Sequence, residues 1–157
     1  MTSHSESATS HGAFDDERQH WITVRVYYED TDFTGMVYHA NYLRFFERGR
    51  SDFLRDAGVS HQSLLARETP AAFTLTNIEV DYKKAAKVDD LLSIRTRSLG
   101  VKGVRMYFEQ TCFRGDEVIA EGRVTAVMIH ADGRPMRPIK DIVEQLKPFE
   151  YQAEKTD

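Results

Sequence analysis

The chain has 157 residues, enough for one domain with a substantial core and too few for two ordinary domains. Its 21 Lys and Arg against 25 Asp and Glu give a net charge of −4, so no general basic field exists for nucleic acid or an anionic membrane. The single cysteine, Cys112, excludes an internal disulfide and a multi-cysteine metal site. No segment approaches the roughly 20 apolar residues of a membrane-spanning helix, and a cytoplasmic location is the simplest interpretation.

Residues 1–20 are expected to form a disordered N-terminal tail. The segment is rich in Ser and His and has neither an apolar stretch nor a basic start, so it does not fit a signal peptide or a membrane anchor. The folded domain is therefore placed at residues 21–150.

A strand and a turn are predicted next along the chain. Apolar residues alternate with polar ones from Val24 to Tyr28, which predicts a half-buried strand ending near Asp30. Thr34 and Gly35 supply the residue types of a turn. Strand and turn together bring several carboxylates, Asp32 among them, to one point.

A helix is predicted from Asn41 to Asp56, because aromatic residues and Gly49 recur there at helical spacing and Gly58 follows as a stop. A helix start presents unpaired backbone N–H groups and the positive end of a dipole, which can stabilise a carbonyl oxygen as it becomes negative. The carboxylate of Asp32, placed shortly before such a start, suggests acyl chemistry.

The remaining chain is predicted to be mostly strands. Ser60 is expected to cap a short helix, and a change of phase near Asn77 predicts a β-bulge in the first of four strand-like runs. A turn is expected at residues 101–103 and a C-terminal helix at 138–147. Segregated strands after one aromatic helix favour an α+β domain with an antiparallel sheet packed on that helix, rather than a βαβ nucleotide fold.

The segment YYEDTDFTGMVYHANYLRFFERGR carries a family resemblance. Its acidic pair, Gly turn, Val-Tyr-His-Ala and amphipathic helix resemble the active-site region of the 4-hydroxybenzoyl-CoA thioesterase family, within it the YbgC-like acyl-CoA thioesterase branch. The likeness covers roughly residues 21–147. It implies a hot-dog fold, in which an antiparallel sheet wraps a long central helix, and hydrolysis of an acyl-CoA without a metal or an organic cofactor. It also implies homodimers or homotetramers with active sites between subunits.

The resemblance places the catalytic carboxylate at Asp32, which could attack the thioester carbonyl or act as a general base for water. Composition alone favours a simple turn-capping role for this residue. The resemblance also implies that the backbone N–H of His39 polarises the thioester carbonyl, while its ring orients Asp32 or water or is merely structural. The resemblance also implies that Gly35 and Tyr38 line the substrate site. Glu47 lies on the predicted helix and is expected to pair with a neighbouring arginine, and it is the second choice for the catalytic carboxylate.

Coenzyme A carries several phosphate charges, so a CoA substrate requires a local basic patch. Arg97, Lys102 and Arg105 surround one predicted turn and are the first candidates, although a solvated turn is an equal alternative. Arg134 and Arg137 are weaker candidates.

Three other interpretations compete. DTDFT fits the Asp-x-Asp-x-Thr pattern of haloacid-dehalogenase-type phosphatases, but those need a doubly wound α/β domain. DTDFTG fits the start of an EF-hand loop, but the twelfth position from Asp30 is Asn41 instead of Glu, which disfavours a metal. A non-catalytic hot-dog module that binds an acyl thioester, an acyl carrier protein or another protein is the third. The resemblance also implies association with the Tol-Pal system or phospholipid-synthesis proteins.

Overall fold

The computed structural model describes residues 12–153. Their elements are, in chain order, β1 (Gly12–Phe14), β2 (His20–Arg25), the 3₁₀ turn η2 (Tyr28–Asp30), α1 (Asn41–Asp56), α2 (His61–Leu65), β3 (Ala71–Tyr82), β4 (Leu91–Lys102), β5 (Arg105–Arg114), β6 (Glu117–His130), α3 (Lys140–Leu146) and η3 (Lys147–Phe149). No helix within this part of the chain is long and apolar enough to cross a membrane.

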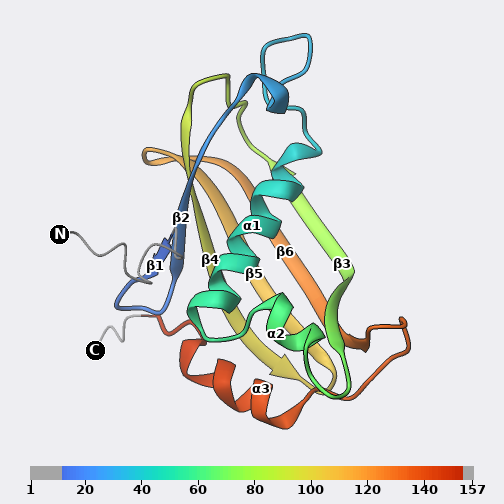
Figure 1. Cartoon of the computed structure of the whole chain (residues 1–157). Helices are drawn as coiled ribbons and strands as arrows, with labels where there is room; N and C mark the ends of the chain where they lie inside the picture. The colour runs from blue at the N-terminus through green and yellow to red at the C-terminus, as the bar shows by residue number, and fades with distance from the viewer. Residues whose placement is uncertain (1–11, 154–157) are drawn as a thin grey trace, which may run out of the picture.

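The strands form one antiparallel sheet of six in the order β1-β2-β4-β5-β6-β3, and α1 lies across one of its faces (Figure 1). The predicted α+β arrangement is confirmed. Because all strand pairs are antiparallel, the doubly wound domain that the phosphatase interpretation needs is absent from residues 12–153.

Helix α1 has the bounds that its aromatic spacing predicts, and it buries Tyr42, Phe45, Phe46 and Phe53 against the sheet. Gly49 allows the close approach, because a Cβ there would lie only 2.9 Å from the side chains of Gln110 and Thr96. The helix is therefore held by its packed face, and its opposite face is left for charged residues.

The strand predicted to reach Asp30 ends at Arg25 instead, and that part of the prediction was wrong. The Asp30 N–H donates to the Tyr27 carbonyl at 3.0 Å, and the Asp30 carboxylate accepts the Tyr27 N–H at 2.8 Å. These two bonds fold residues 28–30 into a 3₁₀ turn and leave Tyr28 87% exposed. The hydrogen bond between the Asp30 side chain and the Tyr27 backbone therefore determines the local conformation, although the alternation of residue types predicted a strand.

The predicted disordered tail is only partly tested, because residues 1–11 lie outside the described part. Disorder was wrong for residues 12–20, since Gly12–Phe14 pairs with β2. The Phe14 ring explains this order, because it packs on those of His20, Phe53 and Phe149 at centroid distances of 4.9, 5.0 and 4.8 Å.

The turn expected at residues 101–103 lies at 103–104, because Val101 and Lys102 still pair with Met106 and Arg105 in the sheet. Three other local predictions hold. The side chain of Ser60 caps α2 by accepting the Ser63 N–H at 3.0 Å. The register of β3 against β6 shifts between Leu75 and Asn77, where the bulge was predicted. The C-terminal helix is present but shorter than expected, because α3 begins at Lys140.

Candidate active site

The chain between β2 and α1, residues 26–40, forms a loop at one end of the sheet (Figure 1). Asp30 lies inside it and is only 7% exposed. Its carboxylate accepts the Tyr27 N–H at 2.8 Å and the side-chain amide of Asn41, the first residue of α1, at 2.9 Å. The Asp30 carboxylate therefore connects the chain after β2 to the first residue of α1, which is a structural role.

Asp32 is exposed in the turn that follows, and Thr34 is its main partner. One carboxylate oxygen accepts the Thr34 N–H at 2.9 Å and also the Thr34 hydroxyl. The Gly35 N–H closes the turn on the Asp32 carbonyl at 3.0 Å, with a φ of +80° that favours glycine. The Thr34 hydroxyl, then its N–H, and then the charge of His39 lower the pKa of Asp32 below its ordinary value. The carboxylate is therefore ionised at neutral pH.

His39 lies between that turn and α1. Its carbonyl accepts the Tyr82 hydroxyl from β3 at 3.0 Å, and its ring lies 4.5 Å from the Tyr38 ring. The N–H groups of Tyr38 and Asn41 donate to backbone carbonyls at 2.9 and 2.8 Å, whereas the His39 N–H makes no hydrogen bond within residues 12–153. The loop thus presents an ionised carboxylate, an imidazole and an available N–H donor, a set that can perform acyl transfer.

Large apolar side chains surround this carboxylate and face outward. Phe33 is 101% exposed, and exposed apolar groups at this density indicate a surface that another molecule covers. The others are Tyr27 at 60%, Tyr28 at 87%, Met36 at 37% and Tyr38 at 46%.

The turn between β4 and β5 carries Lys102 and Arg105 away from the loop. Leu91, at the start of β4, pairs with Arg25 beside the loop, and Lys102 ends this strand of 12 residues. At roughly 3.3 Å per residue, the two ends of β4 lie about 36 Å apart. One protomer therefore does not bring these two cations to Asp32.

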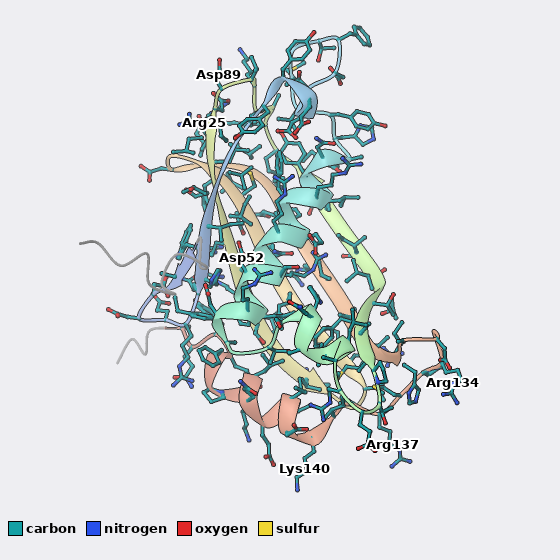
Figure 2. The ribbon with its side chains drawn as sticks, in the orientation of Figure 1. Arg25, Asp52, Asp89, Arg134, Arg137 and Lys140 are labelled. Carbon is teal, nitrogen blue, oxygen red and sulfur yellow. The ribbon has the colours of Figure 1, made fainter. Side chains whose placement is uncertain are left out.

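Arg97, the third basic candidate, is occupied within the protein. Its guanidinium donates to Glu109 at 2.9 Å and to Gln19 at 2.6 Å, and it stacks 4.1 Å from the centre of the Tyr151 ring. These contacts indicate a structural cation on the outer face of the sheet. The weaker candidates Arg134 and Arg137 lie with Lys140 at the end of the molecule away from Arg25 and Asp89 (Figure 2).

Glu47 makes no ion pair within residues 12–153, so the expected pairing with a neighbouring arginine was wrong. Its carboxylate instead accepts the Ser51 hydroxyl at 2.7 Å. Cys112 is fully buried, and burial raises the pKa of its thiol to about 12, so this side chain is protonated and inert.

Two residues of the loop site were missed by sequence reasoning. Thr34 holds the candidate carboxylate, and the Asp-x-Thr spacing of a side-chain turn was a usable signal for it. Tyr82 holds the carbonyl of His39 from a strand 43 residues later, and no local pattern reveals that contact.

Comparison with known proteins gives a consistent set of relatives. The family model of the thioesterase-like superfamily matches residues 26–150. The acyl-CoA thioesterase YbgC of Haemophilus influenzae is 43% identical over 116 residues, 74% of this chain and 83% of that protein. An acyl-CoA thioester hydrolase YbgC of Escherichia coli is 38% identical over 128 residues, 79% of this chain and 92% of its own length. The crystal structure of a probable thioesterase from Bartonella henselae superposes with a TM-score of 0.74 at 38% identity, covering 77% of this chain and 99% of that one.

Proposed function

The chain belongs to the thioesterase-like superfamily, and on that basis we propose that it hydrolyses an acyl-CoA to a free carboxylic acid and CoA. One observation carries the proposal at the level of residues. The loop holds the Asp32 carboxylate ionised through Thr34 and presents the available N–H of His39 shortly before the start of α1. A thioester carbonyl needs this combination of an attacking or base group and an oxyanion donor.

Asp32 has two possible roles in this reaction. As a nucleophile, its carboxylate adds to the thioester carbonyl and the CoA thiolate leaves, and water then cleaves the mixed anhydride to regenerate the carboxylate. As a general base, it takes a proton from the water that attacks the carbonyl. The lowered pKa keeps the carboxylate ionised at neutral pH, which both roles require. In both roles the N–H of His39 donates to the oxygen that becomes negative.

We propose further that the protein acts as a dimer joined along β3, with α1 and the curved sheet in the hot-dog arrangement. β3 is an edge strand of 12 residues that pairs with β6 on one side, so its other side offers backbone donors and acceptors to a second copy. Antiparallel pairing of two β3 strands about a two-fold axis satisfies these groups. Two such dimers would make the expected tetramer.

Such a dimer explains the position of the basic residues. Two-fold pairing sets the Tyr82 end of one β3 beside the Ala71 end of its partner, and Ala71 pairs with His130 at the end of β6. Arg134 and Arg137 follow directly and lie near this end of the molecule (Figure 2). We propose that they bind CoA phosphates for the partner's Asp32, in preference to Lys102 and Arg105, whose strands β4 and β5 lie further from the edge.

The test is thiol release from acyl-CoAs with short, long and aromatic acyl groups. Asp32→Asn should cost at least about 100-fold in kcat/KM, the usual scale for a lost acid/base or nucleophile, without lowering Tm. Glu29→Gln, which removes an exposed carboxylate of the same loop, is the matched control and should keep the native rate.

Two outcomes contradict the assignment. Full activity of Asp32→Asn together with loss in Glu47→Gln would move the chemistry to α1. Binding of acyl-CoA by the native chain without any thiol release would favour the non-catalytic module.

A further inference from the structure

A groove lies between α1, α2 and β3, at the end of β3 opposite the Asp32 loop. Its volume is about 270 Å³, and Leu54, Phe73, Leu75, Phe108 and Ala126 form its apolar walls. The polar side is formed by Glu47, Arg50, Ser51, His61 and Thr74. Apolar walls with a few convergent polar groups are typical of a site for a small organic group.

Arg50 is the unusual member of this lining. Within residues 12–153 its guanidinium makes one hydrogen bond, from Nη1 to the side-chain oxygen of Gln110 at 2.9 Å, and no ion pair. Gln110 is completely buried, and its amide donates to the Phe46 carbonyl at 2.7 Å and to the Thr96 hydroxyl at 2.9 Å. This orientation of the Gln110 oxygen fixes Arg50 in place, with further N–H donors beside the groove.

Arg50 makes no ion pair within residues 12–153, although the Glu47 carboxylate lines the same groove. Burial lowers the pKa of its guanidinium, with the charge of Glu47 acting in the opposite direction, yet arginine stays protonated at neutral pH. A partly buried cation that has no carboxylate hydrogen-bonded to it is costly unless an anion supplies that bond.

The neighbouring polar groups are already committed to one another. Ser51 has one hydroxyl proton, which it donates to Glu47 at 2.7 Å, so at its 2.9 Å contact with His61 the ring N–H is the donor. The hydroxyl proton of Ser51 is therefore used within this cluster and is not offered to a ligand. Arg50 keeps N–H donors that are not used by Gln110 and can bind an anionic group in the groove.

The dimer proposed above sets this groove beside the reacting groups. The Tyr82 hydroxyl bonds to His39, so the Asp32 loop lies at the Tyr82 end of β3, whereas Phe73 and Leu75 lie toward the Ala71 end. Two-fold antiparallel pairing of β3 exchanges these ends, so the loop of one protomer faces the groove of its partner. An acyl group attached at the loop can then extend into the groove.

We propose that Arg50 determines specificity by selecting acyl groups that end in a carboxylate, so that the preferred substrates are CoA monothioesters of dicarboxylic acids. The inference rests on the proposed thioester hydrolysis and deepens it. The apolar walls take the methylene chain, and the guanidinium takes the terminal carboxylate in the two-bond geometry that arginine offers. A chain that ends in methyl leaves the cation desolvated and unpaired.

The experiment compares adipyl-CoA with hexanoyl-CoA, which have acyl chains of equal length and differ in the terminal group. The native protein should show the higher kcat/KM for adipyl-CoA. Because a hydrogen bond to a charged group is lost, Arg50→Gln should lower kcat/KM for adipyl-CoA by about 10- to 100-fold and change that for hexanoyl-CoA by less than about threefold. Arg50→Lys keeps the charge and should keep part of the preference. Arg44→Gln, an exposed arginine of the same helix, should leave both rates unchanged.

Two results would overturn the inference. One is a native protein that hydrolyses hexanoyl-CoA at least as well as adipyl-CoA. The other is an equal loss of both rates in Arg50→Gln with dissociation of the dimer in light scattering, which would mean that Arg50 pairs with a carboxylate of the second copy.

Failure of the proposed hydrolysis is recognised separately, because then neither thioester releases thiol. In that case the groove is tested with the free acids. Adipate and hexanoate both present a carboxylate to Arg50, so each should raise the Tm of the native protein and leave that of Arg50→Gln unchanged, whereas the uncharged hexanol should change neither. The absence of any difference between the acids and hexanol would overturn the inference.

Discussion

The Asp32 loop and the Arg50 groove lie toward opposite ends of β3 and have opposite shapes. The loop projects apolar side chains outward, with Phe33 fully exposed, whereas the groove is a hollow with walls that include the buried Leu54 and Phe108. The loop holds an ionised carboxylate, and the groove holds a cation that is bound to Gln110 and makes no ion pair within residues 12–153. The outward side chains of the loop and the hollow of the groove are complementary in shape, which supports the proposed dimer with two half-sites in each protomer.

The largest effect is expected from a substitution on β3, the strand along which the two regions lie. Leu75, near the middle of the edge strand β3, is 40% exposed. Leu75→Glu places a charge where two β3 strands would pair, and an unpaired buried charge costs several kcal/mol. Leu75 also lines the groove, so the oligomeric state is the measurement that reports on strand pairing. We expect a monomer in light scattering and at least about a 100-fold loss of thiol release, since each half-site then stands alone.

Leu65→Glu is the matched control for that substitution, because Leu65 is an equally apolar residue, 53% exposed on α2 and outside the strand β3. It should stay dimeric and active. A fully active monomer of Leu75→Glu would contradict the two half-sites.

A smaller effect is expected at the tip of the loop. Burying a Phe side chain is worth roughly 1.5–3 kcal/mol, so Phe33→Ala should weaken dimer association by about 10- to 100-fold while Tm at high protein concentration changes little. Sedimentation at several concentrations measures this. Val104→Ala, 45% exposed on the turn after β4, should not change association. Equal effects of the two substitutions would show that the loop tip does not dock on the partner.

The smallest effect is expected from a substitution that changes only the pKa of the Asp32 carboxylate. The Thr34 hydroxyl is the largest cause of the lowered pKa of Asp32, so Thr34→Val should let this pKa rise toward its ordinary value. The group must be ionised to act, and the acid limb of kcat/KM should therefore move to higher pH. Thr34→Ser keeps the hydroxyl and should keep the native profile. An acid limb of Thr34→Val at the native position or below would separate Asp32 from the reaction.

The predictability of the two regions from sequence differs for a physical reason. The bounds of α1 and the bulge near Asn77 follow from residue periodicity, because each buried face must repeat with the period of its element. The loop obeys no period. Alternation from Val24 to Tyr28 predicted a longer strand, and the bonds of Asp30 to Tyr27 and Asn41 decide the conformation instead.

Contacts between distant residues account for the other differences. The pairing of Ser51 with His61 and that of Arg50 with Gln110 join separate elements, and no spacing along the chain indicates them. Lys102 and Arg105 were chosen because they flank a turn, but only the register of β4 shows that this turn lies far from Asp32. Roles for Asp32, His39 and the other candidate site residues stay predictions.

The most direct measurement is subunit complementation between the two half-sites. Asp32→Asn disables the loop, and Thr74→Trp fills the groove from an exposed position on its rim. Each homodimer should be nearly inactive in thiol release. A heterodimer of the two variants, isolated with two different tags, contains one site with both halves intact and should regain about half of the native activity by symmetry. A heterodimer no more active than either homodimer would contradict a site shared between subunits.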